Sequence, residues 1–155
     1  MNSLQLKIVP NDYYRDSESI STLINYANRL NNSLTTGINC SSDATTAINE
    51  FFYIRNFYQK NPARCIRHFI ITSDSIKDEY KMLQLAYQIG LYYLNTYQVF
   101  IGVHNDTSNL HAHFIMNTVS FKDGLIYSAS PNETNQFIHY ITNLGFSVTK
   151  LNDTF

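Results

Sequence analysis

The spacing of apolar residues along the chain predicts an alternation of strands and helices. Residues 4–9 (LQLKIV) alternate apolar and polar side chains, as a strand with one buried face does. Residues 17–34 instead repeat apolar positions at helical spacing, so this segment is expected to be a helix packed on a core. The same criteria predict further helices over residues 43–61, 77–96 and 131–144, and further strands over residues 65–73, 97–104, 110–121, 125–129 and 146–151.

The order of these elements predicts the fold class. Several strands follow one another directly, and Lys122–Gly124 (KDG) has the composition of a hairpin turn. Tight connections favour antiparallel pairing, and grouped helices favour a sheet covered on one side. No internal repeat or Pro/Gly-rich linker interrupts the chain, so we expect a single α+β domain over residues 1–155.

Composition and charge narrow the class of protein and its partners. A chain of 155 residues that is 44% hydrophobic can bury a core without disulfide or metal staples. The apolar stretches are too short to span a bilayer and the N-terminus does not resemble a signal peptide, so we expect a cytoplasmic protein without membrane insertion. Only two cysteines, Cys40 and Cys65, are present, and both are expected to be reduced.

The net charge of -1 gives the whole molecule no attraction to nucleic acid. Any nucleic-acid partner therefore needs a local basic patch. The main concentration of basic residues contains Arg64 and Arg67, which are the candidate DNA contacts. An exposed helix end would explain the same basic residues without DNA.

The main chemical signal is the segment His104–Asn117 (HNDTSNLHAHFIMN), which holds three of the five histidines. His111 and His113 are two positions apart, so in a strand they share a face. His104 ends the preceding predicted strand, and the loop between the strands lets it lie opposite that pair. Three imidazoles with open coordination positions are the ligand set of a catalytic divalent metal.

The metal's identity stays open at this point, because imidazoles suit Mn²⁺, Zn²⁺, Fe²⁺ or Ni²⁺ better than Mg²⁺. Asp106 is placed to accept the free N–H of a ligand histidine and fix its tautomer. Asn117 falls on the same strand face as His113 and could bond a ligand histidine or the backbone, or be an ordinary sheet amide. Solvated polar side chains on an edge hairpin are the simpler alternative for the histidines.

The spacing from His104 to Asn117, followed by TVSFKDG, resembles the third motif of conjugative relaxases, the MobP-type mobilization nucleases of the HUH endonuclease superfamily. The segments TTGINC, RHFIITS and AYQIG resemble the same family in order and spacing. The resemblance implies a five-stranded antiparallel sheet with helices packed on it and the paired histidines on a central strand. It implies a divalent metal, Mn²⁺ or Mg²⁺ with other ions open, and single-stranded DNA at a transfer origin as substrate.

In such relaxases a tyrosine attacks one phosphodiester of the origin strand, leaving a 5′-phosphotyrosine link and a free 3′-hydroxyl, and the reverse attack reseals the strand. The segment LINYANR resembles the first relaxase motif and so assigns the nucleophile to Tyr26, with Tyr13 and Tyr14 as alternatives. A phenol ordinarily has a pKa of about 10 and needs a base or a nearby cation at neutral pH. His104 or Asp106 is the expected aid to deprotonation.

Two other functions fit the same residues. A decayed relaxase would keep the fold and metal site but act as a DNA-binding or plasmid-control module without nicking, which the low basic content favours. An unrelated metalloenzyme with three histidine ligands, such as a small oxygenase, is the other, although the number of helices argues against it. Longer relaxases usually continue into further domains, and accessory mobilization proteins are expected partners.

Overall fold

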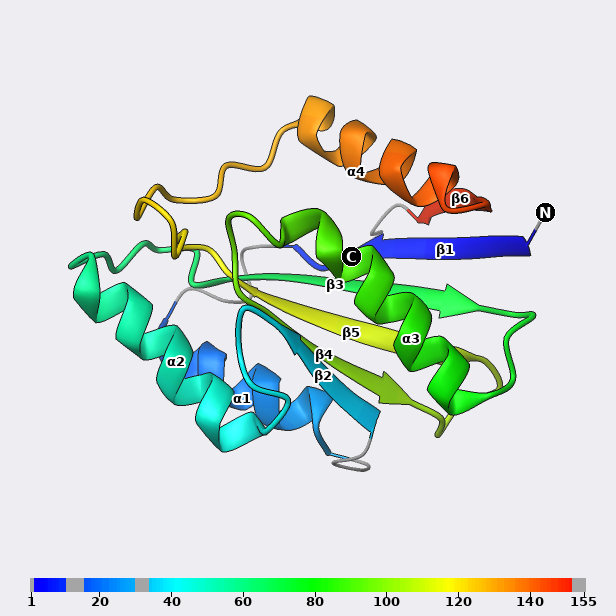
Figure 1. The fold of residues 1–155 in the computed structure, drawn as a ribbon, viewed down its shortest axis with the longest axis horizontal. Coiled ribbons are helices and arrows are strands. Elements are labelled where there is room, and N and C mark those ends of the chain that lie inside the picture. The colour runs from blue at the N-terminus through cyan, green and yellow to red at the C-terminus, as the bar shows by residue number, and fades with distance from the viewer. Residues whose placement is uncertain (1, 11–15, 30–33, 152–155) are drawn as a thin grey trace.

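The chain folds as one six-stranded sheet with helices packed on it (Figure 1). The computed structural model describes residues 2–10, 16–29 and 34–151. The strands are β1 (Asn2–Ile8), β2 (Thr35–Ile38), β3 (Ile66–Ser73), β4 (Val99–His104), β5 (Leu110–Asn117) and β6 (Phe146–Leu151). The helices are α1 (Glu18–Ala27), α2 (Ala44–Phe57), α3 (Glu79–Gly90), continued by a short 3-10 turn (Leu91–Tyr93), and α4 (Pro131–Asn143).

The sheet confirms the α+β class but differs from the expected five antiparallel strands. Its order is β2-β4-β5-β3-β1-β6, and every neighbouring pair is antiparallel except β1 and β6, which are parallel. The sequence predicts no strand at β2, because this strand has only 4 residues and contains Gly37. The strand predicted over residues 125–129 is reduced to an isolated bridge between Val119 and Ile126.

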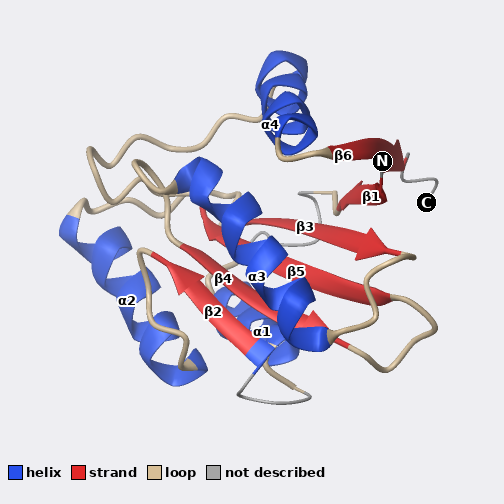
Figure 2. Ribbon diagram, turned by 45° about the vertical axis from the view of Figure 1, so that its right-hand side comes forward, coloured by secondary structure: helices blue, strands red, loops and turns tan. Residues whose placement is uncertain are grey.

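Helices cover both faces of the sheet, so the prediction of one covered face is wrong. Figure 2 shows α3 in front of the sheet and α1 behind it. The helices α3 and α4 pack with Phe114 in one core, whereas α1 and α2 pack with Ile115 in a second core. Consecutive residues of β5 are thus apolar on opposite faces, and each face needs its own layer of helices.

The central strands bring the histidine segment together. In the antiparallel pair of β4 and β5, His104 lies directly opposite His111, and Gly102 lies opposite His113. Ala112 and Phe114 point into the core beneath α3, so the predicted alternation of β5 holds. The histidines therefore occupy the face of the sheet that α1 covers.

The last turn of α1 rests directly on β4 at Gly102. A Cβ atom at this position would lie 2.1 Å from the backbone oxygen of Ala27. Any larger residue would push α1 away from the strand, together with the side chains that α1 carries.

Among the described residues, no helix is both long and apolar enough to cross a membrane.

Gly102→Ala is expected to lower the free energy of unfolding by about 1–3 kcal/mol, because the clash is with backbone and cannot be relieved by a rotamer change. Chemical denaturation measures the effect. Ser147→Ala on the exposed strand β6 is a control, with an expected change within about 0.5 kcal/mol. Equal stability of the Gly102→Ala variant and the control would show that α1 is not seated on β4 in this way.

Candidate functional site

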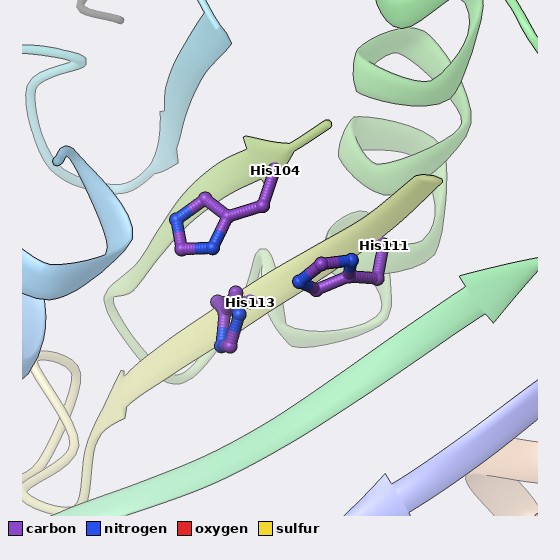
Figure 3. Close-up of side chains that lie close together, drawn as sticks. All are labelled: His104, His111 and His113. Carbon is purple, nitrogen blue, oxygen red and sulfur yellow. The ribbon is translucent and has the colours of Figure 1, made fainter. Parts of the chain in front are cut away.

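Three histidine rings gather over one face of the sheet, from the end of β4 and the first half of β5 (Figure 3). The ring centroid of His104 lies 4.4 Å from that of His113 and 5.3 Å from that of His111, and the last two are 5.2 Å apart. One ring nitrogen from each residue lies within 4.8 Å of the other two. This spacing suits three ligands of a single metal ion.

Two of the three rings carry a nitrogen that has no hydrogen-bond partner. His104 Nε2 lies 3.1 Å from the Ala27 backbone oxygen, which leaves Nδ1 buried and unbonded. His113 Nδ1 lies 3.0 Å from His68 Nε2, which leaves Nε2 buried and unbonded. Buried polar atoms without partners are costly and rare, and a coordinated ion would satisfy both lone pairs. The donor set therefore fits a divalent metal.

His111 completes the set from a more open position. Its Nδ1 lies 3.2 Å from the Asn109 backbone oxygen and 3.3 Å from the Thr107 hydroxyl. As Nδ1–H donates to these oxygens, the lone pair stays on Nε2 and is free to coordinate. The loop after β4 thus orients His111 through backbone and hydroxyl oxygens rather than through a carboxylate.

Burial favours the neutral form of His68, His104 and His113, and neutral imidazole is the form that binds metals. Removal from water lowers the pKa of His113 to about 2 and that of His68 to about 4. Burial also lowers the pKa of His104, more than its hydrogen bond to Ala27 raises it. Lone pairs, rather than positive charges, therefore face the common space at neutral pH.

Tyr26 lies against this cluster from the last turn of α1. Its ring centroid is 5.4 Å from that of His104 and 5.1 Å from that of His113, and both contacts are edge-on. The side chain is 38% exposed, so the ring packs while solvent or substrate can reach the residue. The alternative tyrosines, Tyr13 and Tyr14, lie outside the described residues.

A cation lies over the same tyrosine. The guanidinium carbon of Arg29 is 4.4 Å from the Tyr26 ring centroid. One of its terminal nitrogens donates to Asp106 Oδ2 at 2.6 Å. The Asp106 carboxylate therefore accepts a hydrogen bond from Arg29, whereas the sequence predicts that it accepts one from a ligand histidine. The backbone oxygen of Ala27 and the ring of His68 fill the positions expected for that carboxylate.

Of the roles that the sequence leaves open for Asn117, the structure has hydrogen bonds to the backbone and to Gln98 rather than to a ligand histidine. Its Nδ2 donates to Phe51 O at 3.2 Å and to Gln98 Oε1 at 2.9 Å. Its Oδ1 accepts from the Val119 N–H at 3.2 Å. Asn117 is four residues further along β5 than His113, and its amide ties the end of the strand to α2 instead of reaching a ligand ring.

The two candidate DNA contacts lie away from the histidines. Arg67 is only 6% exposed and its guanidinium carbon lies 5.6 Å from the Tyr127 ring centroid, within the opposite layer of the sheet from the histidines. Arg64 is exposed but precedes β3, whose first residue pairs with Asn117 at the far end of β5. Strand alternation places Arg67 on the same face of the sheet as the buried Phe69, which is the face opposite the histidines.

Sequence reasoning missed His68 and Arg29. Ile70 on β3 pairs with His113 on β5, and His68, two residues before Ile70, lies on the same face of the sheet as His113. This shared face can be inferred only once β3 and β5 are known to be neighbours. Arg29 comes three residues after Tyr26, a spacing at which helical side chains are neighbours, and this could have been found from the sequence.

Comparison with known proteins agrees with the geometry. A family model described as relaxase, MobA/VirD2-like, nuclease domain, matches residues 23–144, which include Tyr26 and the three histidines. No curated protein matches the chain. A solved structure from work on the molecular basis of vancomycin resistance transfer in Staphylococcus aureus has the same fold, with a TM-score of 0.57 and 14% identity over 100% of both chains. The chain therefore belongs to the MobA/VirD2-like relaxase family of nuclease domains.

Proposed function

We propose that this domain nicks and rejoins one DNA strand at the transfer origin of a plasmid or other mobile element through a 5′-phosphotyrosine link to Tyr26. The observation that carries the proposal is the packing of the Tyr26 ring at 5.4 and 5.1 Å from two rings of the histidine cluster. A nucleophile and a metal-binding cluster are the two parts that phosphoryl transfer requires. The family match argues against the alternative of an unrelated metalloenzyme.

The reaction exchanges one phosphodiester for another. The Tyr26 oxygen forms a bond to phosphorus, and the bond from phosphorus to the 3′-oxygen breaks. The leaving oxygen keeps the electron pair and takes up a proton to become the 3′-hydroxyl, and the phenol proton passes to solvent or a nearby base. The reverse attack by a 3′-hydroxyl restores the strand and frees the phenol. No external energy source is needed, because the number of phosphodiester bonds is unchanged.

His104, His111 and His113 would hold a divalent ion, Mn²⁺ or Mg²⁺ with other ions open. When bound, such an ion withdraws charge from the non-bridging oxygens of the scissile phosphate. The hydrogen bond from His104 Nε2 to Ala27 favours a ligand role for His104 over the role of base, because the remaining Nδ1 lone pair faces the cluster.

Arg29 supplies the cation that a tyrosine nucleophile needs. Its guanidinium carbon lies 4.4 Å from the Tyr26 ring centroid, so its positive charge is placed to stabilise negative charge that develops during the attack. Its remaining N–H donors suit a phosphate oxygen. Asp106 holds the guanidinium in place through its ion pair with Arg29, and it is the proposed acceptor of the phenol proton.

Replacing Arg29 by alanine is expected to slow covalent adduct formation about 10²-fold. This is the loss of rate typical of removing one preorganised group that stabilises charge in the transition state. Arg29→Lys keeps the charge without the planar fork and is expected to fall between that variant and wild type. Single-turnover assays with labelled DNA measure the rates. An Arg29→Ala variant as fast as wild type would exclude Arg29 from the reaction.

DNA binding at a transfer origin follows from the family, but this chain carries a net charge of only -1. We therefore propose that accessory mobilization proteins contribute to holding the origin strand. The salt dependence of binding to single-stranded DNA tests how many phosphate contacts the domain makes by itself. A domain that makes few such contacts loses less affinity as salt rises than a strongly basic one does.

The decisive experiment tiles the DNA that flanks the gene with overlapping single-stranded oligonucleotides. Each is incubated with the protein and Mn²⁺, and covalent adducts are resolved by denaturing electrophoresis. One strand of one region is expected to give an adduct that EDTA prevents. Binding without an adduct on the cognate origin strand would instead support the decayed module that controls or binds plasmid DNA without nicking it.

A further inference from the structure

We propose that His68 is a positioning residue, which accepts a hydrogen bond from His113 Nδ1–H and so fixes the tautomer in which His113 Nε2 can bind the metal. The inference deepens the metal site of the proposed function and rests on it. It gives a role to a buried histidine that belongs to neither the ligand set nor the nucleophile.

Strand pairing brings the two rings together. Ile70 on β3 lies opposite His113 on β5, and His68, two residues earlier, points to the same face of the sheet. His68 Nε2 is 3.0 Å from His113 Nδ1, and the ring planes are tilted by 31° with centroids 5.2 Å apart. His68 is 4% exposed and His113 is 3% exposed, so water cannot readily replace either partner.

The shared proton has two arrangements, and only one of them permits coordination. If His113 carries the proton on Nδ1 and donates it to His68, the lone pair of His113 is on Nε2. If His68 Nε2–H is the donor instead, His113 is protonated on Nε2 and cannot coordinate through that atom. Because Nε2 faces the cluster, buried and without a hydrogen-bond partner, the first arrangement is the one that serves a metal.

The group that accepts the His113 N–H is the neutral ring of His68, and this affects the net charge around a bound metal ion. Ligand histidines commonly donate their outer N–H to a carboxylate, a backbone carbonyl or water. Here one outer acceptor is an imidazole, His68, and another is the backbone oxygen of Ala27. Neither brings a negative charge, so the positive charge of a bound ion remains available to an anionic phosphate.

The test uses the protein of residues 1–155 and needs no DNA. Histidine ¹⁵N shifts in the metal-free protein report which nitrogen of His113 carries the proton, and Mn²⁺ titration followed by electron paramagnetic resonance gives the affinity. Wild type is expected to have His113 in the Nδ1–H form. His68→Leu removes the acceptor and is expected to weaken Mn²⁺ binding by about 10–100-fold and to shift His113 toward the Nε2–H form.

His68→Gln is the matched variant, because its amide oxygen reaches as far as Nε2 and can accept the same hydrogen bond. It is expected to restore both the tautomer and most of the affinity, a rescue that a purely packing role would not give. The proposal is overturned if wild-type His113 is in the Nε2–H form, or if His68→Leu binds Mn²⁺ as wild type does. A wild type that binds no Mn²⁺ contradicts the metal site itself, while the ¹⁵N tautomer still decides the part of His68.

Discussion

Replacing Tyr26 by phenylalanine is expected to abolish the covalent protein–DNA adduct, with a loss of more than about 10³-fold, because the variant lacks the attacking oxygen. The phenyl ring keeps the edge-on contacts with His104 and His113. The side chain is partly exposed, so stability is expected to change by no more than about 0.5 kcal/mol. Denaturing electrophoresis after incubation with the cognate strand and Mn²⁺ measures the adduct, and Mn²⁺ affinity is expected to be unchanged.

Tyr53→Phe provides the matched control. Tyr53 is 66% exposed on α2 and loses the same hydroxyl without lying in the histidine cluster. This variant is expected to form the adduct at the wild-type rate. An adduct formed equally well by Tyr26→Phe would move the nucleophile to another tyrosine, with Tyr13 and Tyr14 the first to be replaced.

The local pattern of the sequence was sufficient for most elements but not for their assembly. Helix α2 begins where predicted, and the Asp43 side chain accepts the Thr46 N–H at its start. Strand β2 was missed because four residues with a central glycine carry too little alternation to stand out. The covering of both faces was missed because the run Phe114–Met116 is apolar at every position, which is compatible with burial on either or both sides.

The candidate site likewise contains residues that local sequence places and residues that only the pairing of distant strands places. The gathering of His104, His111 and His113 depends on one hairpin and the two-residue period of a strand, both of which are local. The pairing of His68 with His113 depends on β3 and β5 being neighbours, although the chain between them contains α3 and β4. Such non-local pairing is not encoded in any single window of sequence.

The substitution of His111 by alanine is expected to have the second large effect, a fall in Mn²⁺ affinity of at least about 10²-fold, since losing a ligand costs more than losing its outer partner. His111 is the ligand best suited to the test, because it is only partly buried and its loss leaves the smallest cavity. His139→Ala is the control. His139 is exposed on α4, so this variant loses the same side chain far from the cluster.

Thermal unfolding with and without Mn²⁺ gives an independent measure of this loss. An ion that binds only the folded state stabilises it by about 2.7 kcal/mol at a free concentration one hundred times its Kd. Wild type and His139→Ala are therefore expected to unfold at a higher temperature when Mn²⁺ is added, and His111→Ala is expected to show little or no shift. Equal shifts in all three proteins would mean that Mn²⁺ binds elsewhere, and the histidine cluster would then lose its assigned role even if Tyr26 proved to be the nucleophile.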